Sequence, residues 1–463
     1  MSDLDAVLAR LDADLDAALG RLFAFLAMPS ISTDSAFREP SRRAAEWLAE
    51  DLRSIGFDAG LRETPGQPIV MGRQAGGGAG RHALFYGHYD VQPVDPLDLW
   101  DTDPFRPAMR EIEPGRRVIV GRGACDDKGQ VMTFVEACRA WKAVTGRLPL
   151  GLTVLIEGEE ESGSLNLPAF IEANAGELKA DLALVCDTGM WDRETPAITT
   201  SLRGLVYEEV TIHGADRDLH SGLFGGAAAN PIHVLAKILG ALHDEKGRVD
   251  VPGFYDGVPE LPEQVRREWL SLGLDAAGFL GQVGLAEPSG ERDRSLIELI
   301  QSRPTCDVNG IWGGYSGEGT KTVIPAKASA KVSFRLVGEQ DPDAVSLGFR
   351  RFVSERLPVD CRAEFIHYKG SRAIALPWDM PALAAAREAL TEEWGRRAVT
   401  IGSGGSIPVV GDFKRTLGMD TLLVGFGLDD DRVHSPNEKY DLSSFHKGMR
   451  SWARILAALS APA

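Results

Sequence analysis

The sequence predicts an α/β protein in which a smaller α+β domain is inserted into a larger domain with a mostly parallel sheet flanked by helices. Two observations predict this fold class. Between residues 82 and 186, apolar strand-like runs alternate with helical patterns, which is typical of parallel sheets. From about residue 203 the pattern changes to that of an α+β unit, and the alternation resumes after Trp378.

Helical periodicity opens the chain. Apolar residues recur at helical spacing over residues 4–27 and again over residues 41–55, so we predict a helix in each stretch. The glycines at 76–78 indicate a turn before a strand at 82–87. Three further strands are predicted at 117–121, 151–157 and 181–186. Two helices are predicted between them, at about 128–144 and at 167–175.

The middle of the chain predicts the inserted domain, over residues 203–375. Its strand-like runs lie at 205–213, 307–313, 328–337 and 361–367, and its helical patterns near 229–242 and 341–356. A partly helical insertion with frequent Pro and Gly occupies residues 245–305. The larger domain therefore consists of residues 1–202 and 376–463, and its second part adds helices at 381–394 and 443–459 and a strand at 420–424.

Composition excludes several classes of partner. The 463 residues include 50 Lys and Arg against 67 Asp and Glu, a net charge of −17. A negative field repels phosphate backbones and anionic lipid, so we predict no nucleic-acid partner and no membrane-surface partner. No apolar run approaches the roughly 18 residues of a membrane-spanning helix.

Cysteine usage and the N-terminus predict a cytoplasmic location. The five cysteines are dispersed and odd in number, so a disulfide framework or a cysteine-based zinc site is not expected. The first residues are acidic and lead into the amphipathic helix, without the basic and apolar regions of a signal peptide. Both features fit a reducing cytoplasm.

Polar clusters follow the predicted strands at the points where the strands end. His88 and Asp90 follow the strand at 82–87, and the pair Asp126 and Asp127 follows the strand at 117–121 and a glycine-rich turn. The glutamates at 159–161 and Asp187 follow the next two strands. Because sites in open parallel sheets form beyond the carboxyl ends of the strands, we expect these side chains to lie together.

Each cluster also has an ordinary structural explanation. Three consecutive glutamates are usually a solvated charge run, and Asp126 or Asp127 could cap the helix that begins beside Lys128. Together with His434, however, the clusters make a mixed histidine and carboxylate set suited to zinc or manganese. Five ligands can hold two ions if one carboxylate bridges them, which leaves one glutamate free to activate water.

Four motifs then indicate a family. They are residues 88–93 (His-Tyr-Asp-Val-Gln-Pro), 121–129, 157–164 and 218–222. On these motifs the chain resembles the dinuclear zinc metallopeptidases of the aminoacylase/carboxypeptidase family, in the branch of cytosolic nonspecific dipeptidase and carnosine dipeptidase. The resemblance extends over nearly the whole chain, including residues 321–325 and 404–408.

The resemblance implies a function and an assembly. It implies a hydrolase that cleaves dipeptides, short peptides or small amidated amino acids by means of a metal-bridged hydroxide. Two divalent ions per subunit are implied, zinc or alternatively manganese or cobalt. The larger domain would be catalytic, and the inserted domain would serve as a lid and as the dimerisation domain of a homodimer.

The same resemblance assigns the metal ligands. His88 and Asp187 match the ligands of one ion, and Glu161 and His434 match those of the other. Asp126 matches the carboxylate that bridges the two ions, and in this family the peptide bond that follows it is often cis.

Three residues match catalytic positions. Glu160 matches the general base, and Asp90 matches the aspartate that orients His88. His220 resembles the histidine that reaches from the inserted domain of one subunit into the active site of its partner, where it polarises the scissile carbonyl.

Four further residues match positions that hold the carboxylate end of the substrate. Arg335 and Thr322 match side chains at that end, and Gly405 and Ser406 belong to the glycine-rich loop that closes over it. The alternative for these four residues is a purely structural role.

Other activities stay open. The same metals could deacylate N-acyl amino acids or remove the last residue of a longer peptide, as a carboxypeptidase does. The insertion at 245–305 and the motif at 88–93 favour the dipeptidase. A non-catalytic peptide-binding homologue is a remote alternative, because such a protein is expected to lack a ligand or the base, and none is missing here.

Overall fold

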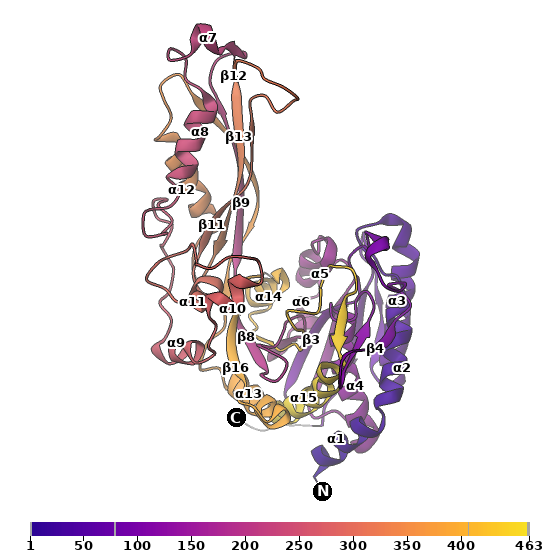
Figure 1. The fold of residues 1–463 in the computed structure, drawn as a ribbon. Coiled ribbons are helices and arrows are strands. Elements are labelled where there is room, and N and C mark those ends of the chain that lie inside the picture. Colours follow the sequence, from indigo (N-terminus) through magenta and orange to yellow (C-terminus); the bar gives the residue numbers. More distant parts are fainter. Residues whose placement is uncertain (1, 78–79, 406, 461–463) are drawn as a thin grey trace. The chain divides into compact units, whose positions relative to one another are not determined.

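A computed structural model of the chain describes residues 2–77, 80–405 and 407–460, drawn in Figure 1. The chain forms two compact units. Unit 1 consists of Met1–Thr200, Leu376–Ile401 and Asp412–Ala463, and unit 2 of Ser201–Ala375 and Gly402–Gly411.

Most of a nine-stranded sheet lies in unit 1, in the order β1-β2-β6-β3-β7-β17-β8-β15, with β16 also paired to β8. Its strands are β1 (Asp58–Arg62), β2 (Ile69–Gln74), β3 (His82–His88), β6 (Gly151–Glu157), β7 (Leu182–Val185), β8 (Ala197–Leu202), β15 (Ile374–Ala375), β16 (Val399–Ser403) and β17 (Thr421–Leu423). The central strands β6, β3, β7 and β17 are parallel, whereas β2 and β8 pair antiparallel to their neighbours. The predicted α/β class is confirmed, and the antiparallel strands lie outside the parallel centre.

The longer helices of unit 1 pack on this sheet and on one another. They are α1 (Asp3–Ala13), α2 (Leu15–Leu26), α3 (Arg38–Ser54), α4 (Lys128–Thr145), α13 (Pro381–Trp394) and α15 (Leu442–Ser460), and the short α5 (Leu167–Ala173) and α6 (Ala175–Leu178) follow β6. Every residue of α4 from Lys128 to Cys138 is buried, because α1, α2, α15 and β3 all contact it. Within the described ranges, no helix combines the length and the apolar character needed to cross a membrane.

An aromatic cluster joins β3, α4 and α15 in the core of unit 1. The rings of Phe85 and Phe134 are stacked with their centroids 3.6 Å apart. Trp452 meets both rings edge-on, at centroid distances of 6.0 Å and 5.3 Å. Because β3 and the N-terminus of α4 both lead into the polar clusters, this cluster fixes the elements from which those clusters extend.

Two expectations for unit 1 are wrong. The helix predicted over residues 4–27 is two helices, because Asp14 between them departs from helical geometry (φ −95°, ψ 7°). The apolar spacing continues across this break, since both helices face the same core. The strand predicted at 117–121 is β5 (Arg116–Val120), and it lies outside the parallel sheet.

A small antiparallel sheet holds β5 instead, in the order β18-β5-β4. A turn at Gly115 (φ 81°) joins β5 to β4 (Ala108–Glu113), whose charged residues hide its strand pattern in the sequence. The other partner of β5 is β18 (Lys439–Asp441), from near the end of the chain. This pairing brings the residues around position 438 beside the loop at 121–126.

Unit 2 contains a four-stranded antiparallel sheet in the order β11-β13-β9-β14. The strands are β9 (Gly204–His213), β11 (Thr305–Gly313), β13 (Lys327–Leu336) and β14 (Arg362–Ser371). Buried and partly exposed residues alternate along β9, and the helices α8 (Pro231–Gly240) and α12 (Pro342–Ser354) pack against the sheet. The insertion contributes α9 (Glu263–Leu270), α10 (Ala276–Gly281) and α11 (Leu296–Gln301), and a short pair joins β10 (Leu219–His220) to β12 (Val323–Ile324).

The aromatic cluster generates a stability prediction. Phe134→Ala should lower the free energy of unfolding by about 3–5 kcal/mol, because the substitution leaves a cavity between two rings that cannot close. The control is Leu165→Ala, which alters a side chain that is 82% exposed and should change stability by about 0.5 kcal/mol or less. Calorimetric unfolding of both variants measures the difference, and equal unfolding temperatures would contradict the assigned core.

Candidate metal centre

The parallel strands of unit 1 end in the predicted polar residues. β3 ends at His88 itself, β6 ends at Glu157 and leads into a single turn at 160–162, and β7 ends two residues before Asp187. Asp126 lies just before α4 begins. His88, the turn at 160–162 and Asp187 lie at the same end of the sheet because β3, β6 and β7 are parallel and all end there. Asp126 follows β5 of the smaller sheet and reaches this end through the loop at 121–126.

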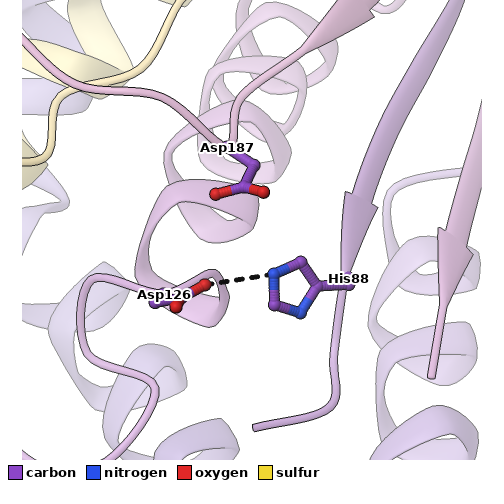
Figure 2. Close-up of side chains that lie close together, drawn as sticks. All are labelled: His88, Asp126 and Asp187. Atoms are coloured by element: carbon purple, nitrogen blue, oxygen red, sulfur yellow. Dashed lines mark hydrogen bonds and ion pairs between the residues drawn. The ribbon is translucent and has the colours of Figure 1, made fainter. Parts of the chain in front are cut away.

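One ligand group consists of His88, Asp126 and Asp187. Each residue offers one donor atom, and the three atoms lie within 4.8 Å of one another. Figure 2 shows both carboxylates near the His88 imidazole, and Nε2 of that ring lies 3.1 Å from Asp126 Oδ1. The spacing of the three donors allows them to share a single cation.

A second group consists of Asp126, Glu161 and His434, again with donor atoms within 4.8 Å. His434 Nε2 lies 2.8 Å from Asp126 Oδ2 and 3.1 Å from Glu161 Oε2. Asp126 therefore belongs to both groups, and its two oxygens face two different histidines. All five residues that the sequence predicts as ligands come together within unit 1.

Asp90 links the first group to the turn that carries the glutamates. Its carboxylate accepts the backbone N–H groups of Glu160 at 3.2 Å and of Glu161 at 3.0 Å. His88 Nδ1 lies 3.4 Å from the same carboxylate and 3.1 Å from the backbone oxygen of Asp90. A donor bond from Nδ1–H to Asp90 leaves the lone pair of Nε2 for a cation.

Two of the structural alternatives are wrong. The Asp127 side chain does not cap α4, because its carboxylate accepts the backbone N–H of His88 at 3.1 Å and the Cys186 thiol at 3.3 Å. The glutamates are not simply a solvated run either, since the side chain of Glu161 is only 3% exposed. The peptide bond between Asp126 and Asp127 is cis.

The electrostatics of the cluster fit divalent cations. Burial raises the pKa of Asp187 well above its usual value, and the charges of Asp127 and Asp126 raise it further. Burial opposes the ionisation of Asp126, but its bonds to His434 and His88 outweigh that effect and lower its pKa. Acidic side chains thus crowd together beside the buried imidazole of His88 and the half-exposed imidazole of His434, and oxygen and nitrogen donors of this kind suit zinc and manganese.

Glu160 stands beside the ligand groups without belonging to either of them, in the part of the chain that the structure describes. Burial raises its pKa to about 8, and the nearby charges of Asp187 and Asp90 contribute to the shift although His88 opposes it. Its backbone N–H is fixed by Asp90. The position leaves its carboxylate available for proton transfer.

Gln92 is a neighbour of the site to which the sequence assigned no role. Its side-chain amide donates to Glu161 Oε2 at 2.7 Å, the same oxygen that faces His434. Its place in the motif at 88–93 was the available signal, but the motif alone does not say which side chain Gln92 meets.

Four of the remaining predicted residues lie in unit 2. His220 is exposed on β10, and its Nδ1 accepts the backbone N–H of Gly222 at 2.9 Å. Exposed Thr322 accepts the N–H of Ser221 on its backbone oxygen at 3.0 Å. The approach of these residues to the ligand groups of unit 1 stays a prediction.

Arg335 and Gly405 share a neighbour that sequence reasoning missed. Arg335 lies on β13, opposite residues of β9 and β11, and the Gly405 backbone oxygen accepts the N–H of Arg203 at 3.2 Å. Burial lowers the pKa of Arg203 to about 10, and the positive charge of Arg335 adds to that effect. Ser406, the last predicted residue, lies outside the described residues.

Two known dipeptidases are similar in sequence to this chain. The chain is 33% identical over 451 residues to Cys-Gly metallodipeptidase DUG1 of Candida albicans, covering 93% of this chain and 92% of that protein. It is 29% identical to the Beta-Ala-His dipeptidase of Homo sapiens, over 92% of this chain and 86% of that one.

A solved structure matches the whole fold. It is the M20 family metallo-carboxypeptidase Sso-CP2 from Sulfolobus solfataricus, with a TM-score of 0.80 and 31% identity over 96% of this chain and 99% of that chain. The model of peptidase family M20/M25/M40 matches residues 84–458, a span that contains both ligand groups. The chain is therefore a member of peptidase family M20/M25/M40.

Proposed function

We propose that this protein is a metal-dependent dipeptidase that hydrolyses the peptide bond of dipeptides or short peptides. The observation that carries the proposal is the position of the Asp126 carboxylate. Two ligand groups share it, and it directs one oxygen toward the histidine of each group. Family membership and the similarity to two dipeptidases support it.

The five ligand residues would hold two divalent ions, zinc or alternatively manganese or cobalt. His88 and Asp187 would hold one ion, Glu161 and His434 the other, and Asp126 both. Such ions, when bound, polarise the scissile carbonyl and lower the pKa of water. Asp90 keeps His88 in the required tautomer through its contact with Nδ1.

Glu160 is the proposed general base. It would take a proton from the attacking water and pass that proton to the departing amine. The two contacts of Asp90, with the Glu160 N–H and with His88 Nδ1, hold the base and a ligand in one network. A carboxylate that is free of both ligand groups is available for this transfer.

Residues of unit 2 would bind the substrate. Nδ1 of His220 accepts a hydrogen bond, so the neutral ring carries its proton on Nε2 and can donate it to a carbonyl oxygen. We assign this role to His220 acting across a dimer. Arg335 would hold the substrate carboxylate, with Thr322 and the loop containing Gly405 and Ser406 closing that end of the site.

The homodimer has a suitable surface in unit 2. β11 is an edge strand of the four-stranded sheet. It carries three exposed apolar side chains, Val308, Ile311 and Trp312. An edge with free backbone groups and apolar side chains favours pairing with another chain, and a second copy of this chain is the proposed partner.

A cytoplasmic location completes the proposal. All five cysteines are free, and four of them are buried. Free thiols of this kind persist in a reducing compartment.

Carboxypeptidase activity is the second candidate, because one of the solved structures that match the chain is that of a metallo-carboxypeptidase. Deacylation of N-acyl amino acids is a further alternative within the same chemistry. We favour dipeptides because the similar proteins of Candida albicans and Homo sapiens are dipeptidases.

A reconstitution experiment tests the proposed function. Protein stripped of metal should be inactive, and zinc, manganese or cobalt added separately should restore hydrolysis of dipeptides. Rates are measured on a panel of dipeptides, longer peptides, and N-acetyl and N-succinyl amino acids. Faster hydrolysis of the acylated amino acids would identify the protein as a deacylase and not a dipeptidase. Full activity without metal would refute the proposal.

Glu160→Gln tests the base. The variant should bind metal as the wild type does but lose about 10²–10⁴-fold in kcat, because general acid–base catalysis contributes that much. Metal content is measured by emission spectroscopy. The kcat is measured with the dipeptide that the wild type hydrolyses fastest.

The matched control is Glu159→Gln. Glu159 precedes the base in the same run, but its carboxylate accepts a hydrogen bond from Asn166 at 2.7 Å and belongs to neither described ligand group. Its kcat should stay within a few fold of the wild type. A near-normal rate for Glu160→Gln would show that another group is the base.

Mixing of variants tests the role of His220. Glu160→Gln and His220→Ala should each be inactive alone, and mixed dimers should regain partial activity because one of their two sites then has both residues intact. Subunit exchange is confirmed by mass spectrometry of differently tagged chains. Exchange without recovered activity would argue that His220 acts within its own subunit or not at all.

A further inference from the structure

Glu438 is a buried carboxylate that follows His434 by four residues, and the proposed mechanism does not use it. Its side chain is 0% exposed. Oε2 accepts hydrogen bonds from Arg122 Nη1 at 2.7 Å and from the Gly123 N–H at 3.0 Å. Oε1 accepts the N–H groups of Cys125 at 3.0 Å and of Asp126 at 3.1 Å.

The backbone of Glu438 is fixed to the same loop. Its carbonyl oxygen accepts the N–H of Gly121 at 3.0 Å, where the ladder between β18 and β5 ends. The loop at 121–126 is thus bound along its length by one residue. That loop ends in Asp126, the carboxylate common to both ligand groups.

The segment before Glu438 carries His434 and is itself anchored. Arg432, His434 and Asn437 all have left-handed backbone angles, with φ between 56° and 62°. Such angles are costly outside glycine and persist where surrounding contacts impose them. The Asn437 side chain provides such contacts, since it accepts the N–H of Asp101 at 2.8 Å and donates to the Leu99 oxygen at 3.0 Å.

We propose that Glu438 is a positioning residue that holds Asp126 and His434 in register before any cation binds. Glu438 holds Asp126 through its hydrogen bonds to the loop at 121–126. It holds His434 because both residues belong to the short segment 432–438, which Glu438 anchors at its end. The inference rests on the proposed function for the statement that the two groups bind cations.

A carboxylate suits this task better than any neutral side chain. Four N–H donors converge on its two oxygens, and both oxygens of an ionised carboxyl accept. A glutamine of the same shape would turn an NH₂ group toward two of those donors. The charge is balanced by Arg122, which is 1% exposed and also donates to the Pro93 oxygen at 2.9 Å.

The test compares two substitutions on the same chain segment. Glu438→Gln should weaken the binding of both ions to metal-stripped protein at least tenfold, because Asp126 serves both groups. Binding is measured by calorimetric titration with zinc and with manganese separately.

Asp441→Asn is the matched control. Asp441 is 1% exposed and accepts two bonds from Arg116, at 3.1 Å and 2.9 Å, within the same β18–β5 pair. Its carboxylate makes no hydrogen bond to the loop at 121–126 in the described residues, and Arg116 and Lys439 neutralise the acidic group that it forms with Asp430 and Asp431. Metal affinity of this variant should stay within threefold of the wild type. Unchanged affinity in Glu438→Gln, or an equal loss in both variants, overturns the inference.

A measurement on the unsubstituted protein covers the case in which Glu438→Gln does not fold. In metal-stripped wild type, the amide hydrogens of Gly123, Cys125 and Asp126 should already be protected from exchange. Protection that arises only after metal is added would overturn the inference. Failure of the wild type to bind any divalent ion would instead contradict the proposed function, so the two failures are distinguishable.

Discussion

The contact of Asp126 with two imidazoles is the interaction on which the described site depends. Each oxygen of this buried carboxylate faces a different histidine, one at the end of β3 and one in a loop near the end of the chain. Taking a carboxylate out of water is costly unless charges or donors compensate. Here the bonds to His88 and His434 compensate and keep the pKa of Asp126 low.

Other carboxylates around Asp126 lack that compensation. Burial raises the pKa of Asp127 to about 7 and that of Glu160 to about 8, and Asp187 is shifted in the same direction. Burying several acids that resist ionisation lowers the stability of a fold, and strongly perturbed groups gather at functional sites. This loss of stability is explained if the cluster serves to bind positive charge.

The sequence predicted the site where local pattern and topology agree. His88 and Asp187 each follow an apolar run, and strand ends in a parallel sheet share one edge, so both could be placed from the chain alone. His434 follows no such strand, so the strand topology alone could not place it beside the other four residues.

The features that the sequence did not predict depend on contacts between segments that are distant in the chain. The capping explanation for Asp127 failed because the N–H of His88 and the thiol of Cys186, remote in sequence, bind its carboxylate. Glu438 had no local signal, since its partners lie more than 300 residues earlier. The break at Asp14 was hidden because apolar spacing continues through it.

The order of the strands along the chain determines when the sheet of unit 1 can be completed during synthesis. β17 lies between β7 and β8 in the sheet, although it is made more than 200 residues after them. All strands of unit 2 leave the ribosome before β17, so unit 2 can fold while the larger sheet still lacks a central strand. A nascent chain therefore carries four of the five residues of the two ligand groups before His434 is made, so the group of Asp126, Glu161 and His434 can form only after the central strand β17 has been synthesised.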